Sequence, residues 1–157
     1  MVIRRAQPGD EIALIEFSKL CYDEMGFDNN GYKFEYEAGL RNYVAGILDN
    51  SKLILTCWDR GVLVGLAVWL LSNKSQYFDN HLIASEIVFH ALPSLGDITK
   101  LKVMRMLQLE STKYCKAMGV KSMFFQYDVR FPAVGRLMEK EGFKPFAVQM
   151  YKDLTEV

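Results

Sequence analysis

The stretch HLIASEIVFHALPSLGDITKLKVMRMLQLESTKYCKAMG, residues 81–119, decides the fold of this chain. Its first part, residues 81–92, is apolar and predicts a strand. Residues 93–99 follow as a short loop, and residues 100–118 carry the apolar spacing of a long amphipathic helix. A helix that begins after such a loop presents free backbone N–H groups and the positive end of its dipole, which together favour an anionic ligand.

The elements on both sides of this stretch predict a single α/β (α+β) domain over residues 1–157. Arg60 and Gly61 form a tight turn between two apolar runs, which predicts an antiparallel hairpin, and Gly65 indicates a bulge or a close backbone approach. We expect a mixed central sheet of six to seven strands with helices on both faces and one parallel crossover. The other expected strands cover residues 2–5, 52–59, 62–71, 120–127, 143–146 and 147–154, and the other helices cover about 11–21, 32–48 and 132–142.

The composition of the chain makes several classes of protein unlikely. Lys plus Arg and Asp plus Glu both number 19, so the formal net charge is zero, which makes nucleic acid an unlikely main partner. The longest apolar run, residues 62–71, is shorter than the roughly 20 residues that a bilayer span needs, and the charged opening MVIRRAQPGDE predicts no signal peptide. Cys21, Cys57 and Cys115 show no metal-ligand spacing. We therefore expect a soluble, cytoplasmic protein with reduced core cysteines and neither a metal site nor a membrane partner.

Three stretches carry a likeness to a known family. The opening VIRRAQPGDEIALIEF is similar to the family's first strand and helix, and residues 86–127 stand where its cofactor-binding strand, loop, helix and next strand belong. The ending RLMEKEGFKPFAVQMYKDL, residues 136–154, looks like its closing helix, Gly-Phe turn and final strand. The Glu-Lys-x-Gly-Phe element at residues 139–143 is the most specific part. Over nearly its whole length the chain thus resembles the GNAT superfamily of N-acetyltransferases.

This resemblance implies a cofactor site and a reaction. GNAT proteins bind acetyl-CoA in a wedge between two parallel strands that part, here residues 85–92 and 122–128. Their pantetheine arm pairs with strand backbone, here near Val88 and His90, and the pyrophosphate lies on the loop and first turn of the next helix. The acceptor amine, of a small molecule or a protein, attacks the thioester directly. A carboxylate or a water removes the amine proton, and often a Tyr protonates the thiolate.

The phosphate loop differs from the family pattern. That pattern is Arg or Gln, two residues, Gly, one residue, then Gly or Ala, and its glycines let the backbone approach the phosphates. The matching window here has neither small residue and reads Thr99, Lys100, Leu101, Lys102, Val103 and Met104. Either Lys100 and Lys102 supply the charge and the window still contacts the cofactor, or the site has lost CoA. Asp97 as N-cap would compete with phosphate for the same amides.

The candidate catalytic residues are Glu86 and Tyr127. Glu86 lies on the strand where several family members carry a catalytic carboxylate, and burial would raise its pKa toward neutrality. Met138 stands in place of the family's Tyr, so Tyr127 or Tyr151 would have to protonate the thiolate, and we select Tyr127. His90 is four residues after Glu86 and is expected on the same face of an alternating strand.

The sequence leaves the acceptor substrate open, and it also leaves open whether the protein is an active enzyme. Residues 22–36 lie where the family builds its acceptor pocket, and Asp23, Glu24 and Asp28 would suit a cationic amine. The altered loop and the missing Tyr also fit a catalytically inactive GNAT-fold binding or assembly module, or a transferase with another acyl donor. Aromatic residues in 22–36, or Tyr77 and Phe78, would suit the surface of a homodimer.

Overall fold

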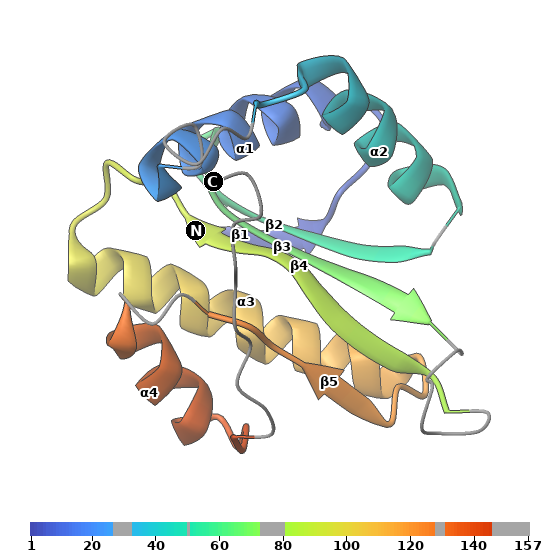
Figure 1. Ribbon diagram of the computed structural model, residues 1–157, viewed down its shortest axis with the longest axis vertical. Coiled ribbons are helices and arrows are strands. Elements are labelled where there is room, and N and C mark those ends of the chain that lie inside the picture. The colour runs from blue at the N-terminus through green and yellow to red at the C-terminus, as the bar shows by residue number, and fades with distance from the viewer. Residues whose placement is uncertain (27–32, 50, 73–80, 128–130, 146–157) are drawn as a thin grey trace, which may run out of the picture.

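The computed structural model describes residues 1–26, 33–49, 51–72, 81–127 and 131–145. A five-stranded sheet with the order β1-β2-β3-β4-β5 lies at its centre, and all neighbours are antiparallel except β4 and β5, which are parallel. Figure 1 shows the elements in chain order, which are β1 (Val2–Arg5), α1 (Glu11–Met25), α2 (Tyr36–Asp49), β2 (Lys52–Asp59), β3 (Val62–Ser72), β4 (Ile83–Ala91), α3 (Asp97–Ala117), β5 (Ser122–Phe124) and α4 (Pro132–Lys140).

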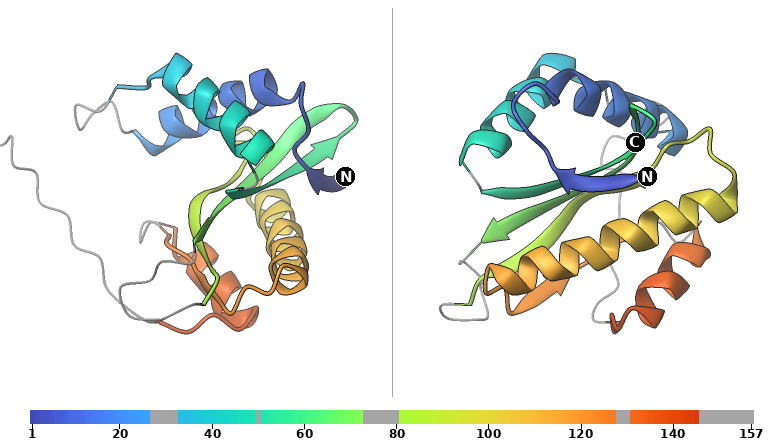
Figure 2. Two further views of the ribbon diagram at one scale, coloured as in Figure 1. Left: turned by 90° about the vertical axis from the view of Figure 1, so that its right-hand side faces the viewer. Right: turned by 180° about the vertical axis from the view of Figure 1, so that it is seen from behind.

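The helices cover both faces of the sheet, as the sequence predicts. Helices α1 and α2 lie on one face and α3 and α4 on the other, as both views of Figure 2 show. The described part of the chain holds five strands, fewer than the expected six to seven. Residues 143–145 form no strand, and the last expected strand, residues 147–154, lies outside the described residues.

Each face of the sheet has its own apolar core. Strands β2 and β3 are buried along most of their length because helices cover both of their faces. Trp69 and Leu107 belong to the core on the α3 side, and Leu14 and Leu66 belong to the core on the α1 side. Cys57 and Cys115 are free and buried, which confirms the expected core thiols, and Cys21 is free and buried as well. None of the described helices is both long enough and apolar enough to cross a bilayer.

The hairpin between β2 and β3 confirms two local predictions. Arg60 and Gly61 connect the strands with φ angles of 49° and 81°, the left-handed geometry that a two-residue hairpin turn requires. A register shift next to Gly65 leaves Val64 without a β2 partner, which is a bulge. A Cβ atom on Gly65 would lie 2.4 Å from Cγ1 of Val103, so the missing side chain also lets α3 approach the sheet.

Several element boundaries differ from the sequence predictions. Helix α1 extends to Met25, beyond the expected end at Cys21, and ends at Gly26 with φ 70°. Helix α2 begins at Tyr36, whereas a helix over residues 32–48 is expected, and residues 33–35 are not helical. Helix α3 begins at Asp97, three residues earlier than expected. Strand β5 has three paired residues, where residues 120–127 had been expected.

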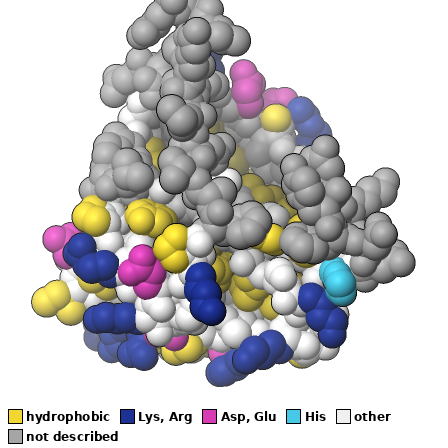
Figure 3. Space-filling view, turned by 60° about the horizontal axis from the view of Figure 1, so that its bottom comes forward, with side chains coloured by type: hydrophobic (Ala, Val, Ile, Leu, Met, Phe, Trp, Pro, Cys, Tyr) yellow, Lys and Arg dark blue, Asp and Glu magenta, His cyan; other side chains and the backbone are white. Residues whose placement is uncertain are grey.

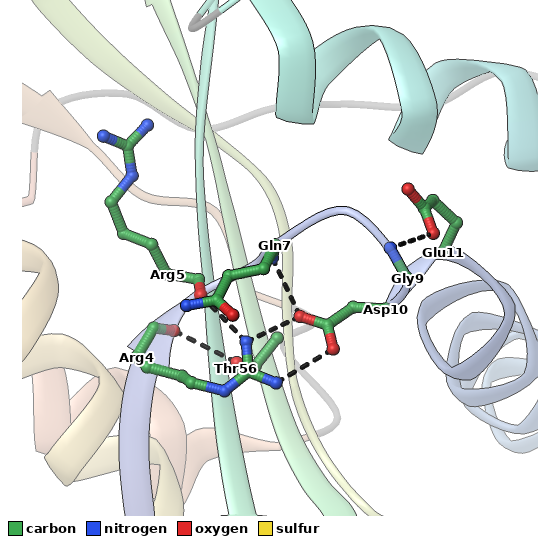
Figure 4. A network of polar contacts seen from close by, with 7 residues as sticks. All are labelled: Arg4, Arg5, Gln7, Gly9, Asp10, Glu11 and Thr56. Carbon is green, nitrogen blue, oxygen red and sulfur yellow. Dashed lines mark hydrogen bonds and ion pairs between the residues drawn. The ribbon is translucent and has the colours of Figure 1, made fainter.

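A polar network fixes the start of α1 against β1 (Figure 4). Asp10 accepts hydrogen bonds from both terminal nitrogens of Arg4, at 2.6 and 2.9 Å, and from the backbone N–H of Gln7 at 2.8 Å. The Arg4 guanidinium also lies 5.2 Å from the ring centroid of Trp58. Asp10 is the N-cap residue of α1, but its side chain makes no cap bond to the helix because Arg4 and Gln7 engage it.

Replacing Asp10 with Asn should lower the free energy of unfolding by about 1.5–3 kcal/mol at neutral pH, since charge-assisted hydrogen bonds are lost. The Arg4 side chain holds the pKa of Asp10 below its ordinary value of 3.8. Stabilisation by the carboxylate is therefore present above pH 3.8 and disappears as the pH falls through the lowered folded-state pKa. Urea denaturation at neutral and acidic pH should show the two proteins converging in acid; a constant gap would contradict this account.

Candidate active site

The two parallel strands part soon after they pair. Strand β4 pairs with β5 at three positions, the last of which joins Ser85 and Phe124. Strand β4 then continues to Ala91, while the described strand β5 ends at Phe124. The strands therefore stop pairing after Ser85 and Phe124, which leaves one edge of residues 86–91 without a described strand partner.

Glu86 stands at the point of separation, directly after the last pair. Its side chain accepts a hydrogen bond from the backbone N–H of Gln126, two residues beyond the end of β5. Burial raises the pKa of Glu86 to about 7, although the Gln126 bond acts in the opposite direction. A carboxyl group with this pKa is partly ionised near neutral pH, which suits a general base.

A bulge at Ile87 determines which way the side chains of β4 point. Val68 pairs with Val88 and Trp69 pairs with Glu86, so Ile87 has no partner on β3. Residues that pair directly across a ladder share a face, which places Glu86 with Trp69 on the α3 side. His90 pairs with Leu66 and therefore faces α1. The prediction that Glu86 and His90 share a face is wrong because the bulge adds one residue between them.

His90 lies in a different environment from Glu86. Burial lowers its pKa, which keeps the imidazole neutral near pH 7, and the charges of Glu24 and Lys100 act on it in opposite directions. Those two residues form an ion pair of 2.8 Å between Lys100 Nζ and Glu24 Oε1. The pair joins the end of α1 to the first turn of α3. His90 is thus placed beside a compensated ion pair, away from the carboxyl group of Glu86.

Aromatic side chains fill the α3 side of the sheet near Glu86. Phe89 and Phe125 meet edge to face with centroids 5.0 Å apart, and Phe143 meets Phe125 at 6.0 Å. Trp69 contacts both Phe89 and Phe125 at 6.3 Å. Gly142, with φ 93°, turns the chain after α4 and brings Phe143 to this cluster. The Gly-Phe element therefore holds the segment after β5 in place.

The start of α3 presents uncapped amides. Gly96 is the N-cap residue, in an extended conformation, and makes no side-chain cap bond. Asp97 is the first helical residue, so the prediction that it caps the helix is wrong. The first intrahelical bond runs from the N–H of Lys100 to the carbonyl of Gly96 at 2.9 Å. The backbone N–H groups of the helical residues before Lys100 have no such partner within the helix. Free N–H groups at a helix start favour an anion.

The predicted phosphate window lies inside α3. Thr99 and Lys100 belong to its first turn, and Lys102 is exposed one turn later. Val103 and Met104 are 0% and 8% exposed and pack in the core beneath the sheet, so their side chains offer no surface to a cofactor. The loop ends earlier than the family spacing implies because the helix begins at Asp97.

The acidic residues expected to bind a cationic acceptor are already engaged. Asp23 pairs with Lys19 within α1, and Glu24 pairs with Lys100. Asp28 lies outside the described residues. The described residues contain no group of three His, Cys, Asp or Glu side chains that could share a metal ion.

Tyr127 lies against α4. Its side chain is 46% exposed, and a Cβ atom on Gly135 would lie 2.4 Å from Cζ of its ring. The absence of a side chain at Gly135 thus gives the tyrosine its place, three residues beyond β5. Tyr151, the alternative proton donor, is outside the described residues.

Basic residues are frequent on the face that carries α3 and α4. Figure 3 shows Lys and Arg side chains spread over this face, which is turned toward the viewer there. On this face the exposed basic residues outnumber the acidic ones. The acidic residues are Asp97, Glu110, Glu139 and Glu141. The exposed basic residues are Lys102, Arg105, Lys113, Lys116, Lys121, Arg136, Lys140 and Lys144. The zero net charge of the whole chain conceals this excess, which favours an anionic ligand on this side.

A cavity on the opposite face was not predicted from the sequence. It lies between α1, α2 and the strands β3 and β4, and Ser18, Tyr43 and Lys52 contribute polar groups to its wall. Ser18 could have been recognised because it stands on the apolar stripe of α1, between Leu14 and Cys21. The other two residues come from separate elements, and no local pattern brings them together.

Comparisons with known proteins agree with this architecture. No protein-family model matches the chain, and no curated protein matches its sequence. Among solved structures, the aminoglycoside N-acetyltransferase AAC(6')-Iy in complex with CoA matches with a TM-score of 0.76 at 14% identity, covering 98% of this chain and 94% of that one. A putative acetyltransferase from Agrobacterium tumefaciens C58 matches with a TM-score of 0.71 at 17% identity over 97% and 100% of the chains.

A further match is a transcriptional regulator from Bacillus halodurans C-125, with a TM-score of 0.73 and 16% identity over 96% and 99% of the chains. Most of the similar structures are acetyltransferases. Sequence identities this low establish a shared overall fold. The chain therefore has the fold of the GNAT superfamily of N-acetyltransferases.

Proposed function

We propose that this chain is an acyl-CoA-dependent N-acetyltransferase that transfers an acetyl group to an amine by direct attack. The observation that carries the proposal is the position of Glu86 at the point where β4 and β5 part, with its pKa raised to about 7. Similar structures support acyl transfer in general, and one of them contains CoA.

In the proposed reaction the amine nitrogen forms a bond to the thioester carbonyl carbon, and the carbon–sulfur bond then breaks. Glu86 accepts the proton that the nitrogen loses, directly or through a water molecule. The leaving thiolate takes up a proton to give the free CoA thiol, and Tyr127 is our candidate donor. Burial of Glu86 supports its role because a base with a pKa near the working pH is the most effective.

The chain offers two groups of contacts to acetyl-CoA as co-substrate. The backbone of β4 near Val88 and His90 would bind the pantetheine arm along the edge that β5 leaves. The uncapped first turn of α3, with Thr99 and Lys100, and the exposed Lys102 would hold the phosphates. We place this reaction in the cytoplasm, a reducing compartment that suits three free buried cysteines.

Replacing Asp97 with Asn should tighten acetyl-CoA binding about two- to fivefold, since a carboxylate in the first turn of α3 repels phosphate by roughly 0.3–1 kcal/mol. Isothermal titration calorimetry at low ionic strength measures the change. Asn keeps the shape of the side chain, and added salt should reduce the difference between the two proteins. Equal affinities at low salt would show that the phosphates bind elsewhere.

The alternative is a catalytically inactive binding or assembly module. Two observations favour it, because Glu24 already pairs with Lys100 and aromatic rings fill the α3 side near Glu86. Thermal melting with acetyl-CoA separates the two functions, since a ligand at about 100 times its Kd stabilises a protein by about 2.7 kcal/mol. A raised melting temperature together with amine-dependent release of CoA thiol would support the transferase. An unchanged melting temperature with several acyl-CoAs, or a raised temperature without thiol release from a broad panel of amines, would favour the module.

A further inference from the structure

A second cavity lies on the basic face, between the C-terminal half of α3 and the start of β5. The turn at residues 118–121 joins these two elements (Figure 1). The cavity has a volume of about 120 Å³, and its wall consists of Thr112, Cys115, Lys116, Val120, Lys121, Ser122 and Met123. Since a cavity of about 150 Å³ holds benzene, this space is large enough for a phosphate group, which has fewer heavy atoms.

The charged residues of this wall are both cationic. Lys116 belongs to the last turn of α3, Lys121 directly precedes β5, and both residues are exposed. Neither lysine has an acidic partner among the described residues, whereas Lys113 on the same helix pairs with Glu110 at 2.8 Å. Among the described residues of the wall, none is acidic. An anion that enters the cavity therefore meets the two ammonium groups with no carboxylate of this wall to oppose them.

Hydroxyl groups add hydrogen-bond donors to this wall. Gln108 Nε2 donates a hydrogen bond of 3.1 Å to Thr112 Oγ1, so this oxygen already serves as an acceptor and its proton remains available to a ligand. Gln108 is 1% exposed, which keeps water from replacing it in this bond. Ser122 contributes another hydroxyl from the start of β5. The polar groups of the wall are thus all able to donate, which suits an anion with several acceptor oxygens.

The end of α3 opposes an anion only weakly. Free carbonyls at a helix C-terminus carry a partial negative charge of roughly half an elementary charge. Here the carbonyl of Cys115 accepts the N–H of Val120 at 2.9 Å. The carbonyl of Lys116 accepts the N–H of Gly119 at 3.1 Å. Because these carbonyls are engaged, the full positive charges of Lys116 and Lys121 exceed the repulsion from the helix end.

The remaining wall residues, Cys115, Val120 and Met123, are apolar. Burial raises the pKa of the Cys115 thiol to about 11, so the thiol is neutral near pH 7 and adds no negative charge. Their side chains offer apolar contact to a short carbon stem attached to the anion.

From this set of groups we infer that the cavity binds a phosphate group, either as free phosphate or on a small phosphomonoester whose carbon stem contacts the apolar wall. A phosphate dianion matches both lysine charges and has oxygens for both hydroxyl groups, whereas a carboxylate has a single charge and fewer oxygens. The site is separate from the proposed phosphate contacts of acetyl-CoA. Thr112 follows Thr99 by 112 − 99 = 13 residues of one helix, which places it about 20 Å farther along the axis.

Amide NMR spectra of the wild-type protein, titrated with inorganic phosphate, ethyl phosphate and acetate at constant ionic strength, test the inference. We expect both phosphates to shift the amide signals of Thr112 and Ser122 saturably, and to bind at least about threefold more tightly than acetate. Tighter binding of ethyl phosphate would identify a phosphomonoester as the ligand, and tighter binding of inorganic phosphate would identify free phosphate. Equal affinities for acetate and phosphate would overturn the inference, as would shifts confined to Asp97 and the first turn of α3.

Substitutions of the lysines test which charges hold the phosphate. Lys116→Met should weaken phosphate binding about threefold, and the double variant Lys116→Met with Lys121→Met should weaken it about tenfold. Lys113→Met is the matched control, because it removes a charge from the same helix at an exposed residue outside the wall. It should leave the affinity nearly unchanged. Equal phosphate affinities in the wild-type protein and the double variant would contradict the inference.

The hydroxyl of Thr112 has its own test. Thr112→Val keeps the shape of the side chain and removes the donor, so phosphate binding should weaken about threefold, whereas Thr112→Ser should retain it. Urea denaturation shows whether Thr112→Val is folded, because it also removes the acceptor for Gln108 Nε2. Should it not fold, the lysine variants decide the question, since they alter exposed residues alone. A folded Thr112→Val protein with wild-type affinity would exclude the hydroxyl from the site and overturn this assignment.

Discussion

Glu86→Gln is expected to lower kcat by about 10²- to 10⁴-fold and to leave the Kd for acetyl-CoA unchanged, because general base catalysis contributes a factor of this size. The amide keeps the size of the side chain and an oxygen that can accept the Gln126 bond, but it cannot take a proton. CoA thiol release, with the amine that the wild-type protein acetylates fastest, measures the rate. In the wild-type protein kcat/KM should rise with pH through about 7.

The same substitution should raise stability in alkaline solution. Burial raises the pKa of Glu86 from 4.5 to about 7, so between these values the folded protein binds more protons than the unfolded chain, and its stability falls as the pH rises. Glu86→Gln removes this loss, which gives a gain of roughly 1–3 kcal/mol at about pH 8 and little difference near pH 4. Unchanged turnover in Glu86→Gln would remove Glu86 from the mechanism, and unchanged stability would contradict its raised pKa.

Trp69→Ala should lower the free energy of unfolding by about 3–5 kcal/mol, the usual cost of deleting a large core side chain. Trp69 is fully buried, contacts Phe89 and Phe125, and donates a hydrogen bond of 2.8 Å from Nε1 to Ser111 Oγ. The substitution leaves a cavity and an unpaired buried hydroxyl, so both effects act in the same direction. Urea denaturation followed by circular dichroism measures the change.

Trp69→Phe separates the two contributions. It keeps an aromatic ring against Phe89 and removes the hydrogen bond to Ser111, so we expect a smaller loss of about 1–2 kcal/mol. If Trp69→Ala lowers the free energy of unfolding no more than Trp69→Phe does, the aromatic cluster does not hold the segment after β5 in place. The position of Glu86 beside Gln126 would then need another explanation.

Short-range signals made most of the fold predictable. The two-residue turn at Arg60 and Gly61, the alternation of apolar runs and the Gly142-Phe143 turn each depend on neighbouring residues alone. The parallel relation of β4 and β5 followed from a strand, a helix and a strand in sequence, because such a crossover places the two strands side by side. Glu86, by contrast, became a candidate through the resemblance to GNAT proteins, several of which carry a catalytic carboxylate on this strand.

Features that depend on pairing across the sheet were not predictable. The bulge at Ile87 arises from the register between β3 and β4, and it reverses the direction of every later side chain on β4, His90 included. The ion pair of Lys100 with Glu24 joins residues 76 positions apart. Helix α3 begins early, at Asp97, because Gly96 before it is extended. The GNAT phosphate-loop pattern, applied to residues 99–104, places the glycines later and does not predict this start.

The central claim is that acetyl-CoA binds where β4 and β5 part, against the first turn of α3. Hydrogen–deuterium exchange of the wild-type protein with and without saturating acetyl-CoA tests this claim most directly. We predict slower exchange in residues 86–91 and in the amides of Asp97, Ile98 and Thr99, with little change in α2. Exchange that stays the same in both regions, or that slows only elsewhere in the chain, would contradict the account.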